Sequence, residues 1–314
     1  MFPNIDPFET GMLDVGDAQN IYWECCGNPV GRPVVYLHGG PGSGCTPGNR
    51  RLFDPAIYKI ILTDQRGCGR SRPHVERASD LEINTTAHLI ADLERLREHL
   101  NVDRWTVVGG SWGTTLALAY AQTHPARVAA MVLACVTTTS HREVRWATHG
   151  VGCLFPEQWA RFASVTSAGR LADQSLVDLY AALVLNPDPE IRDLAAREWC
   201  AWEDTHVSLC PGYTPNPRFE DRSFRLLFAR LVTHYWSHAA FLGDDQLIHN
   251  ASLLGGIPGV LLHGRYDISS PIETAWRLHH AWQGSELKII DEAGHGGGAI
   301  AEKIVESTSR LALA

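Results

Sequence analysis

Apolar and polar positions follow two different patterns along this 314-residue chain. Short apolar or β-branched runs, separated by turn-rich loops, occupy its first part and return near its end. Runs of this kind that alternate with helical periodicity indicate a mainly parallel sheet. The predicted strands are residues 21–26, 34–38, 59–63, 105–108, 129–135, 259–263 and 287–290.

Helical periodicity is clearest in residues 86–100, which can begin at an N-cap formed by Thr85 or Thr86. One face of this segment carries Leu89, Ile90, Leu93, Leu96 and Leu100. An apolar stripe with this spacing predicts a helix that packs on the sheet. Residues 114–123 and 272–282 are also predicted to be helical.

The pattern changes between the fifth and sixth predicted strands. From about residue 139 to residue 243 the chain has helical segments rich in Trp, Arg and Ala, and no strong strand candidate. A chain of this length is expected to add an inserted subdomain to one core. We therefore predict an α/β core of residues 1–139 and 244–314, with helices on both faces of the sheet, and a helical cap of residues 140–243.

Composition excludes several function classes. Lysine and arginine number 27 against 35 acidic residues, a formal net charge of −8, and no dense basic cluster suggests a nucleic-acid surface. No window has the roughly 18 unbroken apolar residues that a membrane span requires. The first 17 residues carry acids and prolines where a secretory signal would need a basic start and an apolar run, so a cytoplasmic location is expected.

The eight cysteines are scattered, and no pair has the CxxC spacing of a zinc or redox site. Reduced, mostly buried thiols are the expected state. No metal or organic cofactor is predicted. The expected partner is a small peptide or small-molecule substrate, and the sequence does not predict an oligomeric state.

Candidate chemistry begins directly after the strand at residues 105–108. The sequence Gly109-Gly110-Ser111-Trp112-Gly113 follows it and leads into a helix, which gives strand, tight turn and helix around a G-x-S-x-G motif. Small residues flank the serine because this turn crowds its neighbours and exposes the hydroxyl. The motif predicts an α/β-hydrolase fold with Ser111 as nucleophile and the Trp112 N–H as an oxyanion donor. Gly40, in the glycine-rich loop after the strand at residues 34–38, is the predicted second donor.

A serine nucleophile needs a histidine base and a carboxylate that orients it. In this fold the chain order is serine, acid, histidine. Asp267 and His295 each lie just past a late strand and are the predicted acid and base. The other histidines considered are His263, His279 and His280, which lie in a strand or a helix. Asp291 and Glu292 are also possible acids, but they lie too near His295 in the chain and are expected at the solvated rim.

The chain resembles the proline iminopeptidases, a branch of the α/β-hydrolases with a helical cap. The resemblance lies in six stretches: HGGPGSG at residues 38–44, DQRGCGRS at 64–71, NTT and ADLERLREHL within 84–100, GGSWG at 109–113, GRYD at 264–267 and GH at 294–295. Members of the family release an N-terminal proline from peptides. The DQRGCGRS block is expected to be a structural turn that supports the site.

The resemblance also implies substrate-binding residues in the cap, where carboxylates bind the substrate's free imino group. Glu203, in a Trp-Glu pair, matches the family's amine anchor, and residues 228–236, which contain Tyr235 and Trp236, resemble a second cap element. There the family has a glutamate where this chain has Val232. The glycines at residues 296–298 also replace bulkier residues, so two features depart from the family pattern.

Three hypotheses follow. The first is a proline iminopeptidase, and the second is a related hydrolase that acts on another amide, ester or lactone. The third is a binding protein that has lost its chemistry, which the filled triad positions disfavour. Dehalogenase or epoxide-hydrolase chemistry would place an aspartate where this chain has Ser111.

Overall fold

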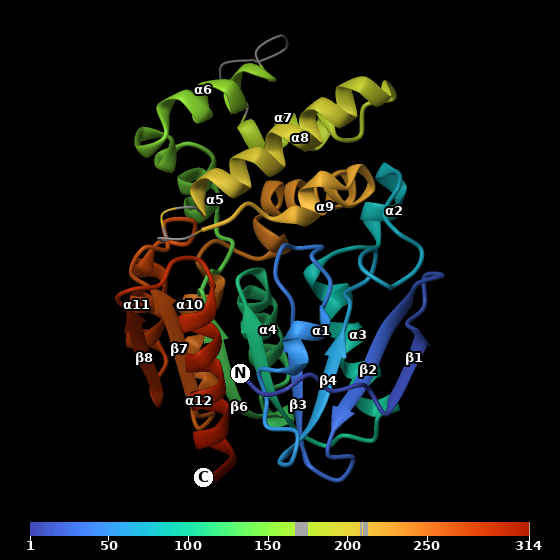
Figure 1. Cartoon of the computed structure of the whole chain (residues 1–314), viewed down its shortest axis with the longest axis vertical. Helices are drawn as coiled ribbons and strands as arrows, with labels where there is room; N and C mark the ends of the chain where they lie inside the picture. Colours follow the sequence, from blue (N-terminus) through green and yellow to red (C-terminus); the bar gives the residue numbers. More distant parts are fainter. Residues whose placement is uncertain (167–174, 208, 210–212, 314) are drawn as a thin grey trace.

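The computed structural model describes residues 1–166, 175–207, 209 and 213–313. Eight strands form one sheet in the order β1-β2-β4-β3-β5-β6-β7-β8 (Figure 1). The six strands from β4 to β8 in this order run parallel, whereas β2 is antiparallel to both β4 and the edge strand β1. The strands are β1 (Glu9–Asp14), β2 (Asn20–Gly27), β3 (Arg32–Leu37), β4 (Tyr58–Thr63), β5 (Trp105–Gly110), β6 (Val128–Ala134), β7 (Gly259–Gly264) and β8 (Ser285–Ile290).

All seven predicted strands are confirmed, with ends that differ by at most two residues. The edge strand β1 was not predicted. Its residues are exposed or only half-buried, so it lacks the apolar run that marks the other strands. It is held by backbone pairing with β2, which side-chain patterning does not reveal.

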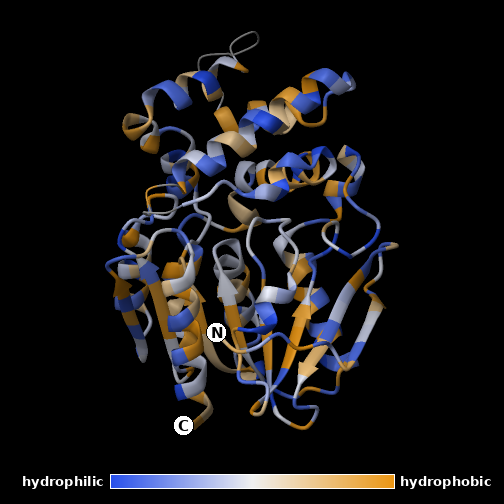
Figure 2. Ribbon diagram, viewed as in Figure 1, coloured by the Kyte–Doolittle hydropathy of each residue, from blue (hydrophilic) through white to orange (hydrophobic). Residues whose placement is uncertain are grey.

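Helices cover both faces of the sheet, as predicted. Two apolar clusters, one on each face, enclose the central strands, which are largely apolar along their length (Figure 2). The predicted helix at residues 86–100 is confirmed, with Thr85 as N-cap and Leu89, Leu93 and Leu96 in the core. The covering helices are α1 (Pro47–Arg50), α2 (Ala78–Glu82), α3 (Thr86–His99), α4 (Trp112–Thr123), α10 (Gln246–His249), α11 (Ile272–Ala281) and α12 (Gly298–Leu313).

A separate layer of helices lies over one end of the sheet (Figure 1). This cap has its own apolar cluster, in which Phe162 stacks on Tyr180 and Trp202, and Trp199 packs edge-on against Tyr180. Its helices are α5 (His141–Thr148), α6 (Pro156–Ser164), α7 (Leu176–Leu183), α8 (Pro189–His206) and α9 (Arg222–Ser237). The boundaries at residues 140 and 243 stay a prediction. Among the helices of the described ranges, none is long and apolar enough to cross a membrane.

Candidate active site

The loop between β5 and α4 presents Ser111 at the end of the sheet. Ser111 has φ 55° and ψ −125°, a strained conformation for a residue with a side chain. The flanking glycines are required by close packing: a Cβ on Gly109 would clash with the Gly113 carbonyl, and one on Gly113 would clash with the Leu37 carbonyl. The predicted strand, tight turn and helix are therefore present, and they project the hydroxyl out of the sheet.

Ser111, His295 and Asp267 form one continuous chain of hydrogen bonds. The distance from Ser111 Oγ to His295 Nε2 is 2.9 Å. His295 Nδ1 lies 2.9 Å and 3.0 Å from the two carboxylate oxygens of Asp267. The three residues come from the loops after β5, β7 and β8, which end at the same edge of the sheet. This geometry can pass a proton from the serine to the histidine while the carboxylate fixes the ring.

Asp267 is buried, yet its surroundings favour the carboxylate. Burial alone would raise its pKa, but the charge and hydrogen bond of His295, the nearby His263 and the Ser270 N–H at 3.0 Å together lower it. His263 accepts from the Val136 N–H at Nδ1, so its Nε2–H donates to the Ser270 carbonyl at 2.8 Å. It is completely buried and engaged on both nitrogens. His263 therefore supports the loop of Asp267 and does not compete as the base.

The predicted oxyanion donors, Gly40 and Trp112, line the same cavity as Ser111. Gly40 has φ +110°, and a Cβ there would lie 2.7 Å from the Gly42 nitrogen, so only glycine allows this loop conformation. The Trp112 indole donates to Gln65 Oε1 at 2.9 Å, and the Gln65 amide donates to the His38 carbonyl at 3.0 Å. These bonds tie the two donor loops together and fix their relative position.

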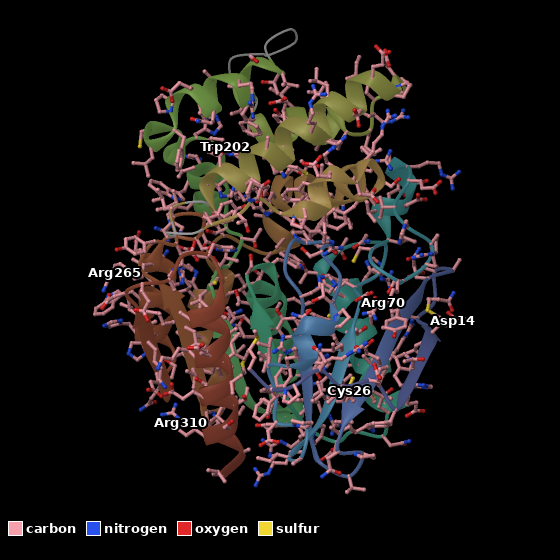
Figure 3. All side chains as sticks on the ribbon, in the orientation of Figure 1. Asp14, Cys26, Arg70, Trp202, Arg265 and Arg310 are labelled. Carbon is pink, nitrogen blue, oxygen red and sulfur yellow. The ribbon has the colours of Figure 1, made fainter. Side chains whose placement is uncertain are left out.

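The DQRGCGRS stretch forms a buried support for these loops. Asp64 accepts the Cys45 N–H at 2.7 Å and pairs with Arg70 at 2.8 Å. Arg70, which is labelled in Figure 3, also pairs with Glu24. Its other arginine, Arg66, forms a two-pronged pair with a buried aspartate of α3. In the described structure, these charges are paired with one another and not with a ligand site.

A cavity of about 330 Å³ lies between the sheet and the cap, directly over Ser111. Core loops supply Gly39, Gly40, Ser111, Trp112, Ser269 and His295 to its wall. Helices and loops of the cap supply Glu143, Glu203, Asp204, His206, Tyr213, Phe228 and Trp236. The hydroxyl of Ser111 and several carboxylates of the cap therefore line the same cavity.

Glu203 lies on the last turns of α8, and 15% of its side chain is exposed. Its Oε1 accepts the Trp199 indole N–H at 3.2 Å. Burial is the main cause that raises its pKa to about 7, against smaller lowering effects of His295 and Trp199. At neutral pH this carboxyl group is poised to ionise when a cation enters the cavity.

The predicted cap residues differ in their placement. Trp236 lines the cavity beside Glu203. Tyr235 lies beneath it, 1% exposed, with its ring on Trp112 and its hydroxyl donating to Asn84 at 2.6 Å. Val232 is completely buried in the apolar cluster of the cap, and from α9 it is Phe228 and Trp236 that reach the cavity wall. The structure thus brings Glu203 and Trp236 together with Ser111, while Tyr235 supports Trp112 from behind.

The polar residues of the cavity wall that were missed in the sequence include Glu143, Asp204, His206 and Ser269. Glu143 accepts bonds from Thr138, Ser140 and Thr274 and so ties the start of α5 to the core. Asp204 accepts the Tyr213 hydroxyl and the Asn216 N–H. The available signal was the i, i+3 spacing of Glu203 and His206, which puts both side chains on one face of a helix.

Within the described residues, one cluster has metal-ligand types at close range, namely Cys135, Asp267 and His295. Burial raises the pKa of the Cys135 thiol well above its usual value, so the thiolate that a metal needs is disfavoured. His295 Nδ1 is already bonded to Asp267. The cluster is therefore better explained by the hydrogen-bonded chain to Ser111. Seven cysteines are free thiols, and Cys210 lies outside the described residues.

The glycine-rich loop after His295 is not closely packed against other residues. Gly296 and Gly297 have φ +102° and +92°, and a Cβ on either would meet no atom within 4 Å. The glycines are thus needed for backbone conformation and not for space. Gly298 begins α12, which returns to the sheet.

The fold and this site define the class of protein. The family model of the alpha/beta hydrolase fold matches residues 32–298, and the chain belongs to that family. A probable proline iminopeptidase of Streptomyces coelicolor is 49% identical, covering 99% of this chain and 98% of that protein. The proline iminopeptidase of Arabidopsis thaliana is 42% identical over 100% of this chain and 82% of its own length. Within the α/β-hydrolases, the chain therefore belongs to the proline iminopeptidase family, as its motifs predicted.

Solved structures support the fold. The crystal structure of a proline iminopeptidase from Mycobacterium smegmatis has a TM-score of 0.67 and 19% identity, covering 97% of this chain and 99% of that one. The crystal structure of VinJ has a TM-score of 0.70 and 18% identity over 98% and 99%. At these identities the likeness concerns the arrangement of the sheet, its helices and the cap.

Proposed function

We propose that this protein is a serine hydrolase that releases N-terminal proline from small peptides, with Ser111, His295 and Asp267 as its catalytic triad. The observation that carries the proposal is the hydrogen-bonded chain of these residues beneath a cavity whose far wall holds Glu203. The names of the curated relatives support the choice of substrate. Action in the cytoplasm is part of the same proposal.

Acylation follows from the geometry. His295 takes the Ser111 proton through the 2.9 Å bond as Oγ attacks the carbonyl carbon of the proline residue. The carbonyl oxygen becomes an oxyanion, which the N–H groups of Gly40 and Trp112 stabilise. His295 then donates its proton to the departing amine, and prolyl-Ser111 remains as an ester.

Deacylation reverses the roles. His295 removes a proton from a water that attacks the ester carbonyl, and the same donors hold the second oxyanion. The proton returns to Ser111 Oγ as free proline leaves. Asp267 stays a carboxylate throughout, because its low pKa and its two contacts to Nδ1 stabilise the imidazolium.

The amine of the substrate needs a partner in this closed site. A cation taken out of water without one costs several kcal/mol. Glu203 lies in the cap wall above Ser111 and can carry the opposite charge. We propose that it anchors the imino group and that the length of one proline residue separates this anchor from the nucleophile.

A second candidate is hydrolysis of another amide, ester or lactone. It is favoured by Val232, which stands where the family pattern has a second glutamate. A pocket that lacks this second glutamate would accept neutral substrates more readily.

The test is a hydrolysis panel with proline 4-nitroanilide, alanine 4-nitroanilide, N-acetylproline 4-nitroanilide and a simple 4-nitrophenyl ester. The proposal expects the highest kcat/KM for free proline, and no turnover of any substrate by a folded Ser111→Ala variant. Equal rates on free and acetylated proline would favour the second candidate. Residual turnover by Ser111→Ala would overturn the triad.

A further inference from the structure

The inference concerns His206, which lies one helical turn beyond Glu203 on α8 and lines the same cavity. His206 is 2% exposed, and its ring packs edge-on against Trp202. Its Nε2 has no hydrogen-bond partner among the described residues. A buried ring nitrogen without a partner is costly, so its role calls for an explanation.

The protonation state of this ring follows from its neighbours. Ser269 Oγ donates to the His206 carbonyl at 3.1 Å and lies 2.7 Å from His206 Nδ1. We assign the single hydroxyl proton to the carbonyl, which makes Nδ1–H the donor to Ser269 Oγ. The Nε2 atom is then left with a lone pair, on a buried ring that lines the cavity.

The charge of the ring supports this assignment. Burial, with a further contribution from His295, lowers the pKa of His206 to about 3. The ring is therefore neutral at physiological pH and acts as an acceptor at Nε2. Its Nε2 lies 3.5 Å from Glu203 Oε2, so two acceptor atoms stand side by side in the wall.

Two neighbouring acceptor atoms are already engaged. Glu203 Oε1 is bonded to the Trp199 indole, and Asp204 Oδ1 receives the Tyr213 hydroxyl and the Asn216 N–H. Glu203 Oε2 and His206 Nε2 thus form a pair of acceptors, in which the carboxyl group ionises when a cation enters and the imidazole stays neutral.

The chemistry of an N-terminal proline fits two acceptors. Its protonated imino nitrogen is a secondary ammonium with two N–H groups, whereas a primary ammonium has three. Glu203 Oε2 and His206 Nε2 are 3.5 Å apart. An ammonium nitrogen about 2.8 Å from each atom fits between them, and linear N–H bonds to both require the two acceptors to move apart by about 1 Å. A primary amine in the same place would keep a third donor to satisfy.

We propose that His206 is a specificity residue of the imino pocket: Glu203 Oε2 accepts one N–H of the substrate's secondary ammonium and His206 Nε2 accepts the other. This inference rests on the proposed function. It supplies the second partner for the amine that Val232, buried in the cap, does not provide.

The experiment compares substrates that offer two, one or no N–H groups: the 4-nitroanilides of proline, N-methylproline and N-acetylproline. The variants are His206→Phe, which keeps an aromatic ring without an acceptor, His206→Gln, which offers an amide oxygen near the position of Nε2, and Glu203→Gln. Labelling of Ser111 with a fluorophosphonate counts competent active sites in each preparation. The measured quantity is kcat/KM per labelled site.

We expect His206→Phe to lose about 10-fold or more on proline and much less on N-methylproline, because only proline uses the second N–H. His206→Gln should recover part of the preference for proline. Glu203→Gln should lose activity on both cationic substrates. An unchanged ratio of proline to N-methylproline in labelled His206→Phe would overturn the role of His206.

Failure of the proposed function gives a different result. Wild-type enzyme would then cleave N-acetylproline as well as proline, and Glu203→Gln would have no effect. If His206→Phe does not fold, the role of His206 is tested by ¹⁵N NMR of histidine-labelled wild type in the presence of proline or N-acetylproline. The His206 Nε2 signal, assigned with His206→Gln, should shift with proline alone, and no shift with proline would refute the inference.

Discussion

Glu203→Gln is the substitution that tests amine recognition most directly. Glutamine has the size and shape of glutamate, so the Trp199 indole can still donate to Oε1 and the cavity wall keeps its form. What disappears is a negative charge on a side chain that is 15% exposed. The change therefore isolates electrostatics from packing.

The magnitude follows from this burial. Removing one partner of a buried, hydrogen-bonded charge pair costs about 2–5 kcal/mol, much of it from the unpaired charge that remains. Because the glutamine oxygen still accepts a hydrogen bond, we expect about 2–4 kcal/mol. This corresponds to a loss of roughly 30- to 1000-fold in kcat/KM on proline 4-nitroanilide.

The assay compares proline and N-acetylproline 4-nitroanilides at pH 8, where Glu203, with its pKa of about 7, is mostly ionised. The acetylated substrate has no cation, so its kcat/KM should change little. Glu198→Gln is a matched control on the same helix, since Glu198 pairs with Arg161 outside the cavity. It should stay within about 2-fold of wild type, because Glu198, whose side chain is 12% exposed, does not reach the substrate. Loss of less than 3-fold in Glu203→Gln, or equal loss on both substrates, would refute the reasoning.

The remaining predictions concern the triad, the cap core and pH. Asp267→Asn should lower kcat by about 10⁴-fold, because asparagine stabilises the wrong tautomer of His295; near-normal kcat would argue against the triad. Val232→Glu should destabilise the protein by about 3 kcal/mol or more, seen as a lower Tm, because Val232 is completely buried among apolar residues; an unchanged Tm with a lower KM for proline would place this residue in the binding site. Burial opposes the imidazolium of His295, but the charge and hydrogen bond of Asp267 and the charge of Glu203 outweigh it, so its pKa is raised. Since the base must be neutral, kcat/KM on N-acetylproline 4-nitroanilide should rise with pH through a midpoint above about 6.5, and Glu203→Gln should move that midpoint down; a midpoint that stays in place would contradict the coupling.

Much of the core was predictable because local patterns encode it. Strand runs buried on both faces leave an apolar signature, and the turn at Ser111 demands glycines on both sides for steric reasons that any chain must obey. The chain order of Ser111, Asp267 and His295 then selected one acid and one base from many candidates. The edge strand β1 escaped, because its stability comes from backbone pairing with β2.

The cap illustrates which structural features could not be predicted from the sequence. A helical pattern identifies α8 and α9, but it does not state which face turns to the cavity and which to the cap core. Tyr235 and Trp236 are neighbours in sequence, yet one lies beneath Trp112 and the other lines the cavity. Periodicity is a property of one helix, whereas burial depends on every element packed around it.

The sequence by itself predicted the residues that we propose as nucleophile, acid and base, because short-range sterics and strand order limit where each can lie. Only the tertiary structure decided the character of the proposed amine pocket. It buried Val232, raised the pKa of Glu203 to about 7 and brought the loop of Asp267 against His206 through Ser269. The contact between His206 and Ser269 spans 63 residues of chain. Desolvation and the lone pair at Nε2 arise from that long-range packing, which no local motif specifies.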